Sequence, residues 1–332
     1  MSADQNLPPA DAQPAAARGR QTLFARNAQW MPWLLLMGAG TIWGATFALA
    51  RLAAESDFHP LTMNAWQSFV GVVILLAVHA VQRRGLPFGP QERRFYVVCG
   101  LIGTALPGAL YYYAARHVPS GVLAITIATV PMITLVLAHL AKIERASALR
   151  SLGVALGVVA VALLVLPDAS LPDPAAAPWV LLALVCALSY AVENIYIARA
   201  MPQALSSLSA LLGMLAAGGL MTAAVAIPVA GLELPRWPLQ TAEIAIVLMG
   251  LINVIAYSSF VFLIRIAGPV FASQMGYVVT LSGVAWGIAI FAEVHSGWVW
   301  GALVLMLVGL ALVTPRRDAE TNELDVSGNA KP

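Results

Sequence analysis

Ten long apolar segments, separated by short polar connections, make up most of the chain. A hydrocarbon core about 30 Å thick is crossed by a helix of about 20 apolar residues, and each segment approaches that length. The pattern therefore predicts an all-α integral membrane protein with ten transmembrane helices. The predicted helices span residues 32–53, 62–82, 95–115, 120–141, 147–166, 178–199, 206–230, 242–264, 269–291 and 297–314.

The polar segments divide the apolar region into two halves. Residues 1–31 are rich in Ala, Pro and Gln without apolar periodicity, which predicts a disordered cytoplasmic tail. Residues 315–332 predict a second cytoplasmic tail, and the Pro/Asp/Ala segment 167–177 predicts a periplasmic linker. The halves are then residues 32–166 and 178–314, with five predicted helices each.

A weak internal repeat relates the two halves. The stretch that begins GLIGTALPGALYYYAARHVP at Gly100 is echoed by GLINVIAYSSFVFLIRIAGP at Gly250. Both copies open on Gly-Leu-Ile, continue with aromatic residues, and end on a proline-bearing turn after Arg116 or Arg265. Because five is an odd number, homologous halves must cross the membrane in opposite directions. We therefore predict two inverted five-helix repeats, with a transport pathway at their interface.

Positive charges favour one side of the predicted topology. Three lie on the side opposite the termini, namely Arg51, Arg116 and Arg236. The other fifteen lie on the side of the termini: Arg18, Arg20, Arg26, Arg83, Arg84, Arg93, Arg94, Lys142, Arg145, Arg150, Arg199, Arg265, Arg316, Arg317 and Lys331. Positive residues accumulate in cytoplasmic loops, so both termini are predicted to be cytoplasmic.

Composition narrows the possible functions. Hydrophobic residues make up 60% of the chain and charged residues 10%, whereas about a quarter of a soluble domain is charged. A net charge of +2 gives no reason to expect a nucleic-acid partner. Cys99 and Cys186 lie in apolar runs and are interpreted as packing residues, and we expect no metal or cofactor. We also find no zinc-protease, Gly-x-Ser-x-Gly or phosphate-loop motif, which argues against an enzyme. The expected partners are a small-molecule substrate and the lipid bilayer, with the chain a monomer or a homodimer.

Several apolar helices carry polar or aromatic residues that recur on one face. Polar groups are costly in lipid, so they favour a cavity or a neighbouring helix. Each such face comes from a different helix, and together the faces predict a central substrate pathway. Its candidate residues are Trp43, Thr46, Gln67, Tyr111, Thr126, Tyr190, Glu193, Asn194, Asn253, Tyr257, Ser273, Gln274 and Tyr277.

Each candidate also has a structural interpretation. Serine and threonine in membrane helices commonly hydrogen-bond to their own backbone. The amides of Asn64, Asn194, Asn253 and Gln274 could instead join neighbouring helices. Glu193 is the one carboxylate well inside a predicted helix; it could couple protons or bind a substrate ammonium group, or it could pair with Arg199 or Arg265.

Two prolines lie inside predicted helices of the first half. Pro107 and Pro131 each remove a backbone donor and permit a kink, so both are candidate gating bends. In the second half Val279 stands near the position that corresponds to Pro131. We therefore expect the hinge motion to lie in the first half.

These features resemble the drug/metabolite transporter superfamily, and its EamA-type members in particular. The resemblance rests on Trp43-Gly44-Ala45-Thr46-Phe47 and on the small residues and Pro131 of the 120–141 helix. It also rests on Glu144 and Glu293, which follow corresponding helices of the two halves.

The resemblance implies ten helices in two inverted repeats, alternating access around a central cavity, and export of a small metabolite from a bacterial cytoplasm across the inner membrane. The 147–166 and 297–314 helices would be peripheral. Within the superfamily the chain is most similar to exporters of aromatic and neutral amino acids. The alternatives are export of cationic drugs, nucleosides or purines, and, less favoured, a channel or a membrane-embedded enzyme.

Overall fold

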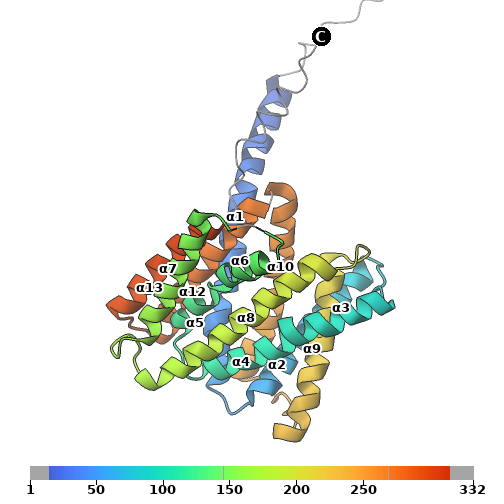
Figure 1. Ribbon diagram of the computed structural model, residues 1–332. Coiled ribbons are helices and arrows are strands. Elements are labelled where there is room, and N and C mark those ends of the chain that lie inside the picture. Colours follow the sequence, from blue (N-terminus) through green and yellow to red (C-terminus); the bar gives the residue numbers. More distant parts are fainter. Residues whose placement is uncertain (1–14, 145, 268, 315–332) are drawn as a thin grey trace, which may run out of the picture.

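The computed structural model describes residues 15–144, 146–267 and 269–314, and over these residues the secondary structure is entirely helical (Figure 1). Nine segments of at least 18 residues are apolar enough to cross a membrane, and Gly297–Val313 is a shorter tenth. The all-α membrane fold is therefore confirmed.

The first half contains the first five spans. They are α1 (Ala15–Ala54), α2 (Pro60–Val81), a third span of α3 (Pro90–Gly100), η1 (Leu101–Ala105) and α4 (Leu106–Ala115), a fourth of α5 (Ser120–Ile127) and α6 (Val130–Leu140), and α7 (Ala148–Val165). The second half, after the short helix η2 (Pro174–Ala176), contains α8 (Ala177–Ala200), α9 (Ser207–Ala230), α10 (Thr241–Ala267), a ninth span of α11 (Pro269–Ser273) and α12 (Met275–Phe291), and α13 (Gly297–Val313).

Local chemistry explains where several helices begin. The side chains of Ser147, Ser206 and Ser296 each accept a hydrogen bond from the backbone N–H three residues on, which caps α7, α9 and α13. Pro60 and Pro90 occupy the first turn of α2 and α3, where no backbone donor is needed.

Two features differ from the helix bounds expected from the sequence. α1 begins at Ala15, earlier than the predicted helix 32–53, and so includes the segment 15–31; residues 1–14 lie outside the described residues, and the cytoplasmic tail stays a prediction. The alanine-rich composition of this segment favours helix once a long apolar helix follows it. The ninth span is interrupted at Gln274, although it contains no internal proline, so breaks occur in both halves.

Helices of the first half pack mainly against helices of the second half. α1 packs against α10 and α12, and α8 packs correspondingly against the third and fourth spans. α2 packs against α9, and α7 packs against α13 at the side of the bundle. These pairings are the ones expected of two related halves, and they place α7 and α13 at the periphery (Figure 1).

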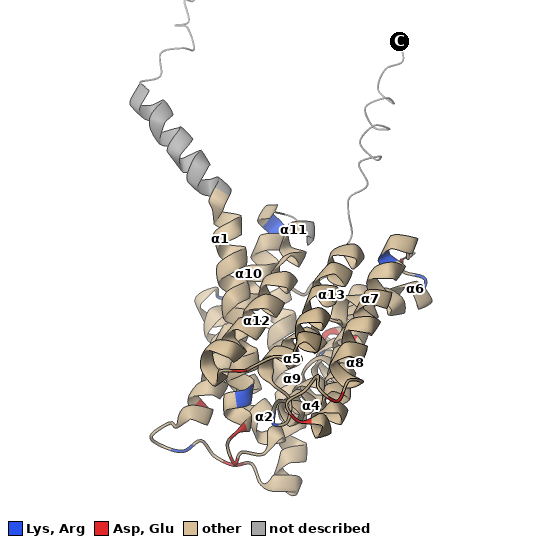
Figure 2. Ribbon diagram, turned by 90° about the vertical axis from the view of Figure 1, so that its left-hand side faces the viewer, with Lys and Arg blue, Asp and Glu red and all other residues tan. Residues whose placement is uncertain are grey.

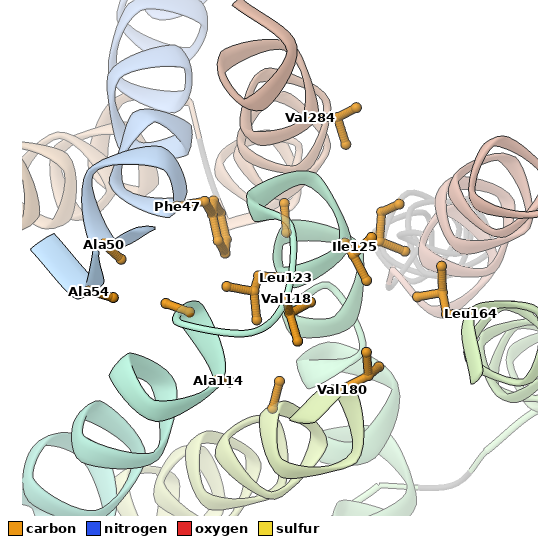
Figure 3. Close-up of a cluster of buried hydrophobic side chains, with 14 of the residues drawn as sticks. Phe47, Ala50, Ala54, Ala114, Val118, Leu123, Ile125, Leu164, Val180 and Val284 are labelled. Carbon is orange, nitrogen blue, oxygen red and sulfur yellow. The ribbon is translucent and has the colours of Figure 1, made fainter. Parts of the chain in front are cut away.

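The hydrophobic core lies around α5. Leu123 and Ile125 of this helix are fully buried, and Phe47 of α1 and Val284 of α12 belong to the same cluster (Figure 3). Val180 of α8 completes the contact from the other side. The core thus joins helices of both halves at the centre of the bundle.

The two ends of the bundle differ in charge. We call the end that holds residues 55–59, 116–119, 166–176, 231–240 and 292–296 the linker end, and the opposite end the terminal end. Most acidic residues lie at the linker end (Figure 2), namely Glu55, Asp57, Asp168, Asp173, Glu233, Glu243 and Glu293. The described arginines and lysine concentrate at the terminal end, as the topology predicted. Which end faces the cytoplasm stays a prediction.

Candidate functional site

A hydrogen bond between α1 and α10 joins two predicted pathway residues. The indole Nε1 of Trp43 donates to Oδ1 of Asn253 at 3.1 Å, and both side chains are partly buried. This bond connects spans that are 210 residues apart in sequence. The interhelical interpretation of the Asn253 amide is therefore the one seen in this conformation.

Glycines next to Trp43 let α1 lie directly against α12. A Cβ on Gly44 would fall 2.0 Å from Oγ of Ser282 and 2.8 Å from the backbone nitrogen of Gly283. Phe47 in turn lies against Gly283. The Trp-Gly-x-x-Phe motif thus places α1 between α10 and α12: tryptophan reaches one helix, and glycine and phenylalanine contact the other.

The third span contains a π turn at its centre, Leu101–Ala105. Pro107 follows this turn and cannot donate a backbone hydrogen bond, so a carbonyl upstream is left without its usual partner. Side chains from other helices bind the carbonyls of the turn. Oγ of Ser189 donates to Ile102 O at 2.5 Å, and Nδ2 of Asn64 donates to Thr104 O at 3.1 Å. The helix is thus perturbed just before Pro107, in the form of a π turn held by α2 and α8, and the gating role of Pro107 stays a prediction.

Glu193 of α8 lies against this π turn. Its residue is 6% exposed, and its Oε1 atom is buried without a hydrogen-bond partner. A Cβ on Gly103 would fall 1.9 Å from Oε1, so the carboxyl group lies directly on the glycine backbone. Among the described residues Glu193 forms no ion pair, and Arg199 instead donates to Ala141 O at 2.6 Å. The structural ion pair with Arg199 is not formed.

Tyrosines surround the same region. Tyr111 lies 6.1 Å from Phe47 and from Tyr112, measured between ring centroids. Tyr112, which sequence reasoning left out of the pathway, is fully buried and donates to Oε1 of Gln67 at 2.6 Å. Tyr190 lies near Tyr111 and Tyr112, and Tyr257 lies near Glu193. Trp43, Gln67, Tyr111, Tyr190, Glu193, Asn253 and Tyr257 therefore converge on the bundle interior from five spans.

Other candidates are placed differently. Thr46 and Thr126 each donate to a carbonyl of their own helix, at 2.6 Å to Trp43 O and 2.8 Å to Val122 O. Asn194 is exposed and donates to Oγ1 of Thr134 at 3.3 Å, away from the Glu193 carboxyl group. Ser273, Gln274 and Tyr277 are partly buried around the break of the ninth span.

The breaks in the fourth and ninth spans have the same local form. Thr129 N bonds to Thr126 O at 3.2 Å, and Gln274 N bonds to Phe271 O at 3.1 Å. Each contact joins residues three apart and tightens the helix locally. Pro131 lies in the first turn of α6, directly after the first break, and its gating role stays a prediction. At Gln274 a tight turn appears without a proline, so helix periodicity gave no sign of it.

Glu293 organises the linker end in a way that the sequence did not reveal. Its Oε1 accepts hydrogen bonds from Arg51 Nη1 at 2.6 Å, Ser120 N at 2.8 Å and Ser120 Oγ at 2.9 Å. Oε2 accepts from Gly121 N at 3.1 Å. Glu293 thus caps the N-terminus of α5, where the helix dipole favours negative charge, and joins it to α1. We call these four residues the Glu293 cluster.

His295 lies beside the Glu293 cluster, with Nε2 3.4 Å from the Glu293 carboxylate and a side chain that is 2% exposed. Burial lowers the pKa of His295 below its usual value, and the negative charge of Glu293 opposes that shift. At neutral pH the imidazole is therefore uncharged, and Arg51 is the cation that pairs with Glu293.

Two cavities lie outside the polar interior. One, of about 460 Å³, is an apolar groove between α6, α7 and α8, bordered by Met132, Val158 and Leu188. The other, of about 250 Å³, lies at the linker end beside Arg51 and Glu293. Neither contains Trp43, Tyr190 or Glu193, so the predicted central pathway is not one of these two cavities.

Sequence reasoning missed two residues that shape the site. Gly103 forms the surface under Glu193, and Arg51 was counted only for topology. One feature of the sequence pointed to Gly103. Gly100 aligns with Gly250 in the internal repeat, so Gly103 is equivalent to Asn253, which was a predicted pathway residue.

The chain is similar to known membrane transporters. Residues 30–166 match the model of the EamA-like transporter family. The protein described as uncharacterised inner membrane transporter YedA of Escherichia coli (strain K12) is 28% identical over 279 residues, which cover 82% of this chain and 87% of that protein. The uncharacterised transporter YoaV of Bacillus subtilis (strain 168) is 25% identical over 156 residues, covering 47% of this chain and 53% of that protein.

A solved crystal structure has the same fold. It is 19% identical and superposes with a TM-score of 0.58, covering 84% of this chain and 95% of the other. At this identity the likeness concerns the arrangement of the helices.

Proposed function

Because the chain belongs to the EamA-like transporters of the drug/metabolite transporter superfamily and is a multi-pass inner-membrane protein, we propose that it exports aromatic and neutral amino acids by alternating access. In this proposal the substrate crosses unchanged, so the protein is not an enzyme. Both termini lie in the cytoplasm.

The convergence of aromatic and amide side chains inside the bundle carries this proposal. Tyr111, Tyr190 and Tyr257 supply aromatic surface, which an apolar or aromatic side chain of a substrate would contact. Asn253 and Gln67 supply amide oxygens and nitrogens at the same level, which suit the ammonium and carboxylate groups of an amino acid. In this conformation these amides bind Trp43 and Tyr112, so a substrate would replace those partners.

Alternating access requires that one end of the bundle is closed while the other opens. The Glu293 cluster supports closure of the linker end, because it ties α1, α5 and the loop after α12 together through buried hydrogen bonds. Glu144, which follows the corresponding helix of the first half, is 47% exposed and pairs only with Arg150 at 2.9 Å. The equivalent contact at the terminal end is therefore weaker in this conformation, so we infer that this end opens more readily.

Reconstitution into liposomes tests the proposal. Purified protein is assayed with radiolabelled phenylalanine, leucine, adenosine and ethidium, and the label is recovered by chromatography to show that it is unchanged. We expect saturable flux of phenylalanine and leucine. No saturable flux of either amino acid would contradict the proposal, and flux of adenosine or ethidium alone would assign another substrate class.

Substitutions locate the substrate contacts. Asn253→Ala and Tyr257→Ala should raise the KM for phenylalanine about tenfold, which corresponds to about 1.4 kcal/mol. Trp298→Ala is the matched control, because this tryptophan lies at the start of α13 and is 46% exposed. Unchanged KM values for both interior variants would remove α10 from the site.

A fusion tests the orientation. Alkaline phosphatase is active only outside the cytoplasm, so a fusion after Val313 should be inactive and a fusion in the 167–173 linker active. The reverse result would invert the topology without affecting the transport proposal.

A further inference from the structure

Glu193 is a buried acidic side chain that the substrate contacts proposed above do not use. It is 6% exposed, and its Oε1 has no hydrogen-bond partner within the part of the chain that the structure describes. An ionised carboxylate without a partner in such surroundings is strongly unfavourable, whereas the protonated acid is tolerated. The arrangement therefore indicates a carboxyl group that holds a proton in this conformation.

The carboxyl group of Glu193 lies directly against the backbone of Gly103. A Cβ on Gly103 would fall 1.9 Å from Oε1, 2.1 Å from Cδ and 2.4 Å from Oε2, so the whole carboxyl group rests on the glycine. Gly103 lies midway along the span Pro90–Ala115, and hence near the membrane centre. The π turn around it is a helix form found frequently at functional sites.

The internal repeat shows that this arrangement is particular to one half. Asn253 occupies the position equivalent to Gly103 and binds Trp43 at 3.1 Å, within a continuous α10. In the first half the equivalent position has no side chain, and α8 brings a carboxyl group to it instead. The two related contacts therefore differ. At Asn253 the neighbouring helix forms a neutral hydrogen bond, and at Gly103 it places the carboxyl group of Glu193.

The groups that face Glu193 are neutral. Cys99 of α3, Tyr190 of α8 and Tyr257 of α10 lie near it, and none of them carries a positive charge. Arg199 donates to Ala141 O and Arg150 pairs with Glu144, and among the described residues Arg265 forms no ion pair with Glu193. Among the described residues no positively charged side chain pairs with the Glu193 carboxyl group.

We propose that the Glu193 carboxyl group is the proton-binding site that couples export of the substrate to entry of a proton. The proposal rests on the transport function proposed above. A proton from external water binds the carboxylate while the substrate leaves. When α8 moves away from Gly103 and the site opens to the cytoplasm, water hydrates the carboxyl group. The proton then passes to that water. One proton enters for each substrate released.

Infrared spectroscopy tests the protonation without any substrate. The difference spectrum of the detergent-purified wild type minus E193Q, at neutral pH, should show the carbonyl band of a protonated carboxylic acid. E144Q is the matched control, because Glu144 is exposed and paired with Arg150, and its difference spectrum should lack the band. Absence of the band in the E193Q difference spectrum would overturn the proposal.

Transport driven by a pH gradient tests the coupling. Liposomes that are acidic inside should accumulate labelled phenylalanine, up to about tenfold for one pH unit if one proton exchanges per substrate. E144Q should accumulate as the wild type does, and E193Q should show no gradient-driven accumulation. If E193Q accumulates normally, or if the wild type exchanges phenylalanine but ignores the gradient, the coupling proposal fails. Lack of wild-type exchange contradicts the proposed function instead.

Discussion

Two glutamates of this transporter have buried side chains but opposite surroundings. The Glu293 side chain is 5% exposed and accepts hydrogen bonds from Arg51, Ser120 and Gly121. Glu193 is 6% exposed as a whole residue, and one of its carboxyl oxygens has no partner among the described residues. The first arrangement stabilises a carboxylate anion, and the second stabilises a neutral acid. Burial alone therefore does not tell which acidic residue is structural and which exchanges protons.

The difference follows from where each carboxyl group lies. Glu293 comes after α12, next to the N-terminus of α5, where two backbone N–H groups and the helix dipole are available. Glu193 lies inside α8 and faces a π turn whose carbonyls of Ile102 and Thr104 are already bound by Ser189 and Asn64. These oxygens are acceptors, so they give a carboxylate no donor.

The largest effect should come from removing the negative charge of Glu293. Glu293→Gln leaves Arg51 without its buried partner, and breaking such a pair costs about 3–5 kcal/mol. Glu144→Gln is the matched control: it also removes one ion pair, but at an exposed site where about 0–1 kcal/mol is expected. Thermal unfolding in detergent measures both. Equal shifts of the midpoint in the two variants would show that the Glu293 cluster does not stabilise the fold.

A smaller effect should follow from loosening the π turn beneath Glu193. Asn64→Leu removes the donor to Thr104 O and Ala105 O, and buried interhelical hydrogen bonds in membranes contribute about 1–2 kcal/mol. Ser68→Ala is the matched control, since its hydroxyl is buried on the same helix but bonds only to Asn64 O. The expected order of unfolding midpoints is wild type, then Ser68→Ala, then Asn64→Leu. The reverse order of the two variants would show that the π turn does not depend on Asn64.

A still smaller effect should appear on acidification at the linker end. Burial lowers the pKa of His295 below its usual value of about 6.5, so between these two values the unfolded chain binds more protons than the folded one. The free energy of unfolding is thus highest above about pH 6.5 and falls as the pH decreases through that window. His295→Gln removes the titrating group and should flatten this part of the profile. The same slope in both proteins from about pH 7 to about pH 5 would exclude His295 as its source.

The sequence was sufficient for the membrane spans and for part of the site. Long apolar runs located all ten spans, because lipid requires about 20 apolar residues whatever the tertiary contacts are. Trp43, Tyr190, Glu193 and Asn253, which were selected as pathway residues, are buried or partly buried, since a polar group in an apolar helix must face protein; their role in transport stays a prediction. Asn194 was selected by the same reasoning but is exposed, because neighbouring positions on a helix point in different directions.

The remaining features depend on contacts between distant residues. The tight turn at Gln274 has no proline to announce it, and the π turn became visible only with its partners Ser189 and Asn64. Glu293 was noticed through its place after an apolar helix, but its donors come from Arg51 and Ser120, more than 170 residues away. Which acid would be paired and which left unpaired was therefore not encoded in any local pattern.

The smallest expected effect gives the sharpest comparison between the two glutamates. Glu193→Gln exchanges a neutral acid for a neutral amide of similar size, so the free energy of unfolding at neutral pH should change much less than it does for Glu293→Gln. If Glu193 were instead ionised and held by an unseen cation, the same substitution would cost about 3–5 kcal/mol, as expected for Glu293→Gln. Measuring both variants by thermal unfolding in one detergent makes each the control of the other. If Glu193→Gln lowered the free energy of unfolding as much as Glu293→Gln does, both carboxyl groups would be anions, and only their partners would differ.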